Sequence, residues 1–152
     1  MEKKAASGIM LMLLVVSILA LAFGIQPVKG EPGTWTVDDD DDESADFHTI
    51  QEAINAAGSG DTIHVTSGTY YEHVTINKSL RLIGEYNHTI ITTLNPQQTT
   101  FTYWGFVVEV TKDNVEISQL RIRGEEGIRF YHRNNNIIAD NIIHNKYCGL
   151  SL

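Results

Sequence analysis

Three related strings, GFVV at residues 105–108, GIRF at 127–130 and GLSL at 149–152, decide the fold of this chain. The glycines that open them, Gly105, Gly127 and Gly149, are evenly spaced. Between them, VEISQLRI at residues 115–122 is echoed by NIIADNII at 136–143, one residue short of the same interval. A period of about 22, with short apolar strands and no helix in the repeat, predicts a solenoid of strands in which each repeat is one coil.

Equivalent positions of successive coils are expected to stack, because paired strands lie about 4.8 Å apart. This predicts an interior of stacked apolar side chains that includes Ile117, Ile122, Ile128 and Ile143. The corners between strands suit asparagine, which tolerates left-handed backbone angles and whose amides can form ladders along the stack. The asparagines that fall at such corners are Asn134, Asn135, Asn136, Asn141 and Asn145.

The earlier part of the chain fits the same scheme less regularly, with strands expected at residues 61–66, 73–76, 80–84 and 89–92. Residues 93–104 are predicted to form a loop inserted between coils. A β-sandwich is the competing all-β arrangement. The Asn-Gly and Asp-Gly pairs that signal tight hairpins are absent from the sequence, and this favours parallel pairing.

A short helix is expected at residues 49–57. Thr49 and Glu52 form a capping-box pattern, apolar residues recur at helical spacing, and Gly58 suits the C-terminal cap. A helix of this length is marginal alone, so it must cover an apolar surface. We expect it to close the first coil of the solenoid.

The first thirty residues differ from the rest and resemble a secretory signal peptide, because Lys3 and Lys4 precede an uncharged apolar run over residues 9–25. Cleavage is expected after Gly30, which would place the protein outside the cell or on its surface. The alternative is an uncleaved membrane anchor, for which the run is slightly short of the roughly 20 residues that a bilayer needs. The expected divisions are a signal peptide (1–30), an acidic N-terminal segment (31–48), and a capping helix with an incomplete β-helix (49–152).

The charge of the mature chain excludes one large class of partners. Residues 1–30 hold three lysines and Glu2, so 8 basic and 18 acidic residues remain of the total 11 and 19, a net charge of −10. Such a surface repels phosphate backbones and anionic membranes, so no nucleic-acid partner is expected. Cys148 is the only cysteine, which excludes a disulfide framework and a cysteine-based metal site.

A family resemblance is carried by five strings: WTVDD at residues 35–39, FHTIQEAI at 47–54, GDTI at 60–63, GTYYE at 68–72 and LRLIG at 80–84. Together they resemble the start of the pectin-lyase-like superfamily and, more narrowly, the NosD-like β-helix proteins of archaeal and bacterial surfaces. The resemblance covers essentially everything after the signal. It implies an all-β fold, a right-handed parallel β-helix of about four coils with a short N-terminal capping α-helix.

The resemblance extends to pectin methylesterases, whose carboxylate and glutamine chemistry lies on later coils. Where their first glutamine would lie this chain has Glu126, and where a Gln-Asp pair would lie it has Tyr147 and Cys148. The later Asp and Arg would fall beyond Leu152. No catalytic residue is therefore expected here. The charges at Arg121, Arg123, Glu125, Glu126 and Arg129 are interpreted as exposed strand and turn charges.

Two kinds of binding or modification site are suggested by short patterns. Phe101, Tyr103 and Trp104 could form an aromatic platform for sugar rings, or the insert could fold over a coil and bury them. Asn77 and Asn87 each begin an N-glycosylation sequon, a pattern that is frequent by chance and depends on the host.

No metal site or cofactor is expected. The acidic run at residues 38–43 offers oxygen ligands of the kind that Ca²⁺ prefers, but it lacks the alternating ligands and the glycine turn of calcium loops. A solvated turn is the simpler interpretation. The six histidines raise the question of copper or zinc, yet they form no convincing set in the sequence.

Three functions remain. The first is a secreted or surface module that binds polysaccharide or contributes to an envelope or adhesive layer. The second is the leading segment of a polysaccharide esterase, lyase or epimerase, and the third is a NosD-like copper accessory protein. Because the sequence stops within a coil at Leu152, we expect either further coils or a covering partner, including a second copy of the chain.

Overall fold

Strands dominate the part of the chain that the computed structural model describes, which is residues 30–40, 44–94, 105–131 and 134–152. Within these ranges, no helix has the length and apolar character needed to cross a bilayer. The regular elements belong to one compact unit, Pro32–Leu152. In chain order they are β1 (Thr34–Val37), α2 (Ile50–Ala56), β2 (Thr62–Val65), β3 (Gly68–Tyr70), β4 (Val74–Ile76), β5 (Arg81–Ile83), β6 (Thr89–Thr92), β7 (Phe106–Val110), β8 (Glu116–Ser118), β9 (Arg121–Phe130), β10 (Ile137–Ala139) and β11 (Ile142–Ser151).

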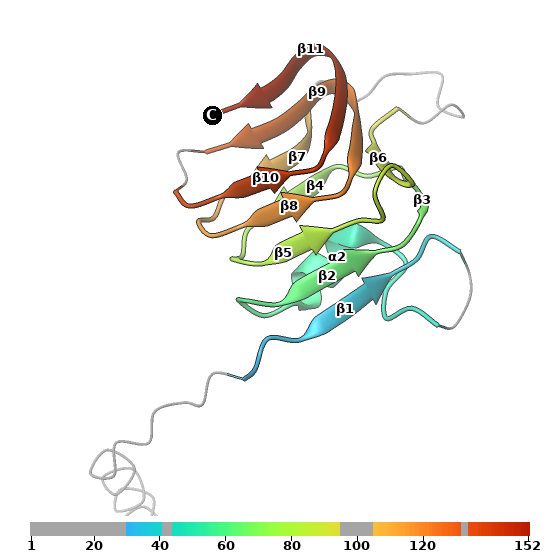
Figure 1. Cartoon of the computed structure of the whole chain (residues 1–152), viewed down its shortest axis with the longest axis vertical. Coiled ribbons are helices and arrows are strands. Elements are labelled where there is room, and N and C mark those ends of the chain that lie inside the picture. The colour runs from blue at the N-terminus through green and yellow to red at the C-terminus, as the bar shows by residue number, and fades with distance from the viewer. Residues whose placement is uncertain (1–29, 41–43, 95–104, 132–133) are drawn as a thin grey trace, which may run out of the picture. The chain divides into compact units, whose positions relative to one another are not determined.

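The strands wind into a solenoid in which the pairings of named strands are parallel. One sheet has the order β1-β2-β5-β8-β10, and the other contains β3, β6, β9, β7 and β4, with β11 beside β9. The long strand β9 bends through two faces, because its start pairs with β6 and its end pairs with β7. The described strands therefore form four three-sided coils, β2-β3-β4, β5-β6-β7, β8-β9 and β10-β11 (Figure 1).

The interior consists of stacked apolar side chains, as the repeat predicted. On one face Ile63, Leu82 and Ile117 are in register, and all three are fully buried. The other two faces stack Tyr70, Ile91, Ile122 and Ile143, and then Val74, Val108, Ile128 and Leu150. Ile117, Ile122 and Ile128 are buried as predicted, whereas Ile143 in the last coil is only partly buried. Full burial of one such side chain contributes about 1.5–3 kcal/mol to folding.

The corners use left-handed backbone angles at positions that recur from one coil to the next. Asn114 and Asn135 have φ of 57° at one corner, and Gln119 and Asp140 have φ of 60° and 54° at another. The predicted asparagine ladder takes a different form, because the amides bond to the main chain of the coil beneath. Asn136 accepts from the Val115 amide, and Asn141 accepts from the Leu120 amide and donates to the Ile117 carbonyl.

These asparagines cannot stack on asparagines of the preceding coil, because apolar residues occupy the equivalent places there. Val115 lies one coil before Asn136, and Leu120 lies one coil before Asn141. Both apolar side chains are almost completely buried. The amides of the later coil therefore satisfy main-chain groups at the corners instead.

Helix α2 closes the first end of the solenoid, as predicted. Its buried residues Ile50, Ala53 and Ile54 face the interior, and the helix contacts β1, β2 and β4. Figure 1 shows α2 at the end formed by β1 and β2, away from β11. The predicted C-terminal cap is wrong, because Ala57 caps the helix and the Gly58 amide donates to the Asp61 carboxylate instead.

The capping box at the helix N-terminus is formed only in part. The Thr49 hydroxyl accepts from the Glu52 amide as the sequence predicted. The amides of Ile50 and Gln51, however, donate to the carboxylate of Glu72, at 2.9 and 3.0 Å. A carboxylate from a distant turn therefore satisfies the orphan donors of the first helical turn.

Candidate functional site

The outer face of β4, β7 and the second half of β9 carries a group of interacting polar and aromatic side chains. Thr75, Glu109 and Arg129 are register partners on this face. They alternate with buried residues of the interior, such as Val108 and Ile128. The alternation of a strand therefore places the Glu109 and Arg129 side chains on the outside.

We call His73, Phe106, Glu109, Arg129 and Tyr131 the outer-face cluster. The Tyr131 hydroxyl donates to Glu109 Oε1 at 2.9 Å, and His73 Nε2 lies 3.6 Å from Glu109 Oε2. The Arg129 guanidinium carbon lies 4.6 Å from the ring centroid of Phe106 and 5.3 Å from that of Tyr131. The cluster thus joins a carboxylate, an imidazole and a guanidinium stacked on two aromatic rings.

Local geometry holds each member in place. The Tyr131 amide donates to the Val110 carbonyl, which continues the pairing of β7 and β9 past the end of β9. His73 directly precedes β4. Phe106 is only 5 % exposed yet does not belong to the main core cluster, which fits its place beneath the Arg129 guanidinium on the outer face.

The cluster offers the partly exposed ring of Tyr131 beside hydrogen-bonding groups, the combination that amphipathic ligands need. Arginine presents five donors in a planar fork and stacks on aromatic faces. Tyr131 is 38 % exposed, and the side chains of His73 and Glu109 are 26 % and 20 % exposed. The group is therefore accessible from solvent while its members hold one another in position.

Sequence alone does not reveal this cluster, because the insert before β7 breaks the period. Along the chain, the step from Thr75 to Glu109 is much longer than the step from Glu109 to Arg129, although all three occupy equivalent places. A single repeat period cannot align the three residues. The sequence predicts only an exposed strand charge at Arg129, and the geometry adds its two aromatic neighbours.

The predicted aromatic platform, Phe101, Tyr103 and Trp104, lies outside the described residues. Asn77 and Asn87 are exposed, and their use for glycosylation stays a prediction. The hydroxyls that complete the two sequons are engaged inside the protein: Ser79 donates to the Asp113 carbonyl, and Thr89 donates to the Val65 carbonyl.

The positions that the resemblance aligned with esterase residues lie beside the cluster. Glu126 is a register partner of both Phe106 and Cys148, so these three residues form one column across successive coils. Tyr147 is 62 % exposed. Among the described residues, no hydrogen bond or ion pair joins the side chains of Glu126, Tyr147 and Cys148.

The acidic segment makes ordinary turn contacts where it is described. Asp38 accepts from the Asp40 amide, and Asp39 accepts from the Thr69 amide at 3.0 Å. Across the described ranges, no three side chains of His, Cys, Asp or Glu gather as metal ligands would.

Four coils of parallel strands closed by a helix are alike in fold to the pectin-lyase-like right-handed β-helices, and this confirms the predicted fold. One solved structure with this likeness is described as "Crystal structure of pectin methylesterase in complex with hexasaccharide VII". It matches with a TM-score of 0.50 and 18 % identity over 73 % of this chain and 47 % of that chain. At this identity the likeness shows the fold alone, and the chain spans about half the length of that esterase.

Comparisons by sequence add nothing further, since no family model and no curated protein matches this chain. The narrower likeness to NosD-like proteins therefore stays a prediction.

Proposed function

We propose that this protein is an exported β-helix module that binds polysaccharide through the outer-face cluster. The observation that carries the proposal is the position of Arg129, which is stacked on Phe106 and Tyr131 while Tyr131 is fixed to Glu109. Export and a place outside the cell or on its surface belong to the same proposal. They are supported by the signal-like pattern of residues 1–30.

Physical features of the cluster support binding rather than catalysis. Both oxygens of Glu109 already have neighbours, the Tyr131 hydroxyl and the His73 ring. The carboxylate is therefore better suited to hold these side chains in place than to exchange protons with a ligand. The guanidinium and the partly exposed ring of Tyr131 provide the surface on which a sugar would lie.

The experiment compares polysaccharide binding by the exported protein and by two charge-matched variants on a glycan array. Arg129→Ala removes the stacked guanidinium, and we expect it to weaken binding at least tenfold, which corresponds to about 1.4 kcal/mol. Arg81→Ala is the control, because Arg81 is an exposed arginine on another face, paired with Glu116. We expect the control to bind as the unaltered protein does.

Two outcomes would contradict the proposal: no polysaccharide retained by the unaltered protein, or equal binding by the two variants.

The second candidate function is the leading part of a polysaccharide-active enzyme. It is favoured by one observation, the match of this chain to 47 % of an esterase chain. Release of methanol or of new reducing ends from a bound polysaccharide would support that second function.

A further inference from the structure

A different outer face, formed by β6, the first half of β9 and β11, carries two arginines. The burial of Ile122 between them shows that Arg121 and Arg123 project outward by strand alternation. Arg121 is in register with Ile90 and Ile142 of the neighbouring coils. We call Arg121 and Arg123 the arginine pair.

The arginine pair lacks the carboxylate partners that two other basic residues, Arg81 and Lys146, have among the described residues. Among the described residues, Arg81 pairs with Glu116 and Lys146 with Glu125, whereas no carboxylate lies within ion-pair distance of Arg121 or Arg123. The register partners of Arg123 are Thr92 and His144, neither of which is acidic. In a mature chain of net charge −10, two adjacent uncompensated arginines concentrate positive charge on one face.

A hydrogen bond to Asn87 fixes the position of the Arg121 guanidinium. Its Nη2 donates to Asn87 Oδ1 at 2.6 Å, while its Nε is buried and has no partner among the described residues. Asn87 lies in a turn with a left-handed φ of 66°, closed by the bond from the His88 amide to the Glu85 carbonyl. A guanidinium fixed in this way loses little further conformational freedom on binding, and it retains donors that Asn87 does not use.

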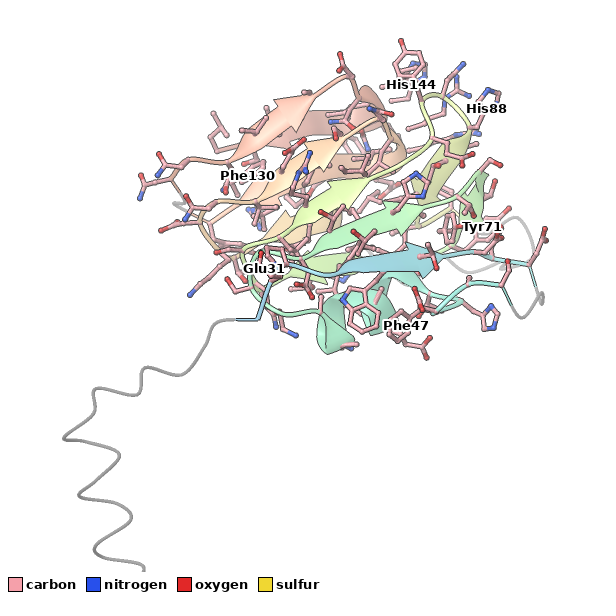
Figure 2. All side chains as sticks on the ribbon, turned by 60° about the horizontal axis from the view of Figure 1, so that its bottom comes forward. Glu31, Phe47, Tyr71, His88, Phe130 and His144 are labelled. Atoms are coloured by element: carbon pink, nitrogen blue, oxygen red, sulfur yellow. The ribbon has the colours of Figure 1, made fainter. Side chains whose placement is uncertain are left out.

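The turn that contains Asn87 and the start of β11 both lie beside the arginine pair, on one side of the molecule. Figure 2 labels His88, from the turn that holds Asn87, and His144, the register partner of Arg123, near each other at the upper right. Ile90 and Ile142 are half-buried above and below Arg121. The face therefore offers positive charge beside modest apolar surface, which suits a charged group carried on a sugar ring.

We propose that the arginine pair is a second subsite that binds an anionic group, a carboxylate or a sulfate ester, on a polysaccharide. This inference rests on the proposed polysaccharide-binding function and adds the charge of the ligand to it. The subsite is separate from the outer-face cluster, because the two groups lie on different faces of the coil.

Three polymers with one backbone test this inference: neutral dextran, carboxymethyl-dextran and dextran sulfate. Affinity electrophoresis of the exported protein is expected to show at least tenfold tighter binding to a charged polymer than to dextran, with the preference weakening as salt rises. Whether the carboxylate or the sulfate polymer binds more tightly identifies the preferred group. The variant Arg121→Gln/Arg123→Gln is expected to lose the preference.

The matched control is Arg81→Gln/Lys112→Gln, which removes the same charge from other exposed positions and is expected to change binding less than twofold. Arg123→Gln alone serves if loss of the Arg121–Asn87 bond unfolds the protein, because exposed Arg123 makes no such bond to another described residue. Equal affinity for all three polymers, or an equal loss in both double variants, would overturn the subsite. The proposed function fails separately, through the Arg129→Ala comparison on the array.

Discussion

The Asp61 carboxylate joins three segments of the chain at the end of the solenoid that α2 covers. It accepts from the Trp35 indole nitrogen at 2.9 Å, the Gly33 amide at 2.9 Å and the Gly58 amide at 2.7 Å. It therefore ties the segment before β1 and the end of α2 to the start of β2. These bonds, that of Trp35 foremost, lower the pKa of Asp61 below its ordinary value of 3.8.

We expect Asp61→Asn to lower the free energy of unfolding at pH 7 by about 1–3 kcal/mol, because an amide cannot accept from all three donors. A carboxyl whose pKa is lower in the folded state stabilises fully above its unfolded pKa, near 3.8, and this stabilisation is lost as the pH falls through the folded pKa. The difference between variant and unaltered protein should therefore shrink in acid.

Urea unfolding at neutral and strongly acid pH provides the measurement. Asp140→Asn is the control, since Asp140 is exposed and its φ of 54° suits asparagine. A stability difference for Asp61→Asn that stays constant with pH would argue against this role.

Individual residues were the hardest to assign from the sequence. The string GDTI at residues 60–63 indicated the family fold, yet nothing in it indicated that Asp61 would bind Trp35. The apolar sequence around Glu109 gives no sign of a site, because its partners His73 and Tyr131 come from elsewhere in the chain. Contacts between coils depend on which residues are register partners. The insert before β7 follows no period, so the sequence does not predict the partners across it.

At the scale of elements, α2 protects an edge as well as covering an apolar end. The side-chain amide of Gln51 accepts from the Thr75 amide at 2.8 Å and donates to the Thr75 carbonyl at 3.3 Å. It thus pairs with the main chain of β4 as another strand would. Burial raises the pKa of the nearby Glu72 carboxyl above its ordinary value, although two helix amides donate to it.

Gln51→Ala should leave both main-chain groups of Thr75 without these partners. We expect a loss of about 1–3 kcal/mol of stability and faster hydrogen exchange at the Thr75 amide. Amide exchange followed by NMR measures the effect directly. Glu52→Ala, an exposed change in the same helix, should leave that amide protected, and equal exchange in the two variants would exclude the pairing role.

The elements themselves were largely predictable. Short runs rich in β-branched and apolar residues predicted the strands at residues 73–76, 80–84 and 89–92, because a strand half-buried in a solenoid needs one apolar side. The three-residue strand β3 was missed, since Gly68–Tyr70 is too short to show an alternation. The helix was predicted correctly, but its caps depend on Glu72 and Asp61, which lie well outside its own sequence.

At the scale of the whole molecule, a residue's contribution depends on its coil. Ile122 and Ile143 are register partners in one interior stack, yet Ile122 is fully buried and Ile143 only partly. Coils below and above enclose Ile122, since Ile91 and Ile143 are its register partners. Equivalent positions in the repeat are therefore unequal in energy.

We expect Ile122→Ala to cost about 2–5 kcal/mol, the usual range for a cavity in a packed core. Ile143→Ala should cost clearly less, because water already reaches part of its side chain. Chemical unfolding of the unaltered protein and both variants measures the two costs. Equal costs would mean that something in the full protein covers the last described coil as completely as β11 covers β9.

The winding of the chain into coils also determines how the protein extends under tension. Hydrogen bonds between coils run along the solenoid axis, and each coil is bonded only to its neighbours. Tension applied to the two ends separates strands one after another instead of shearing a whole sheet at once. Each coil that detaches adds roughly 70 Å of extended chain. Stretching single molecules should show steps of about that size, so a tether built from this fold would lengthen gradually under strain before it broke.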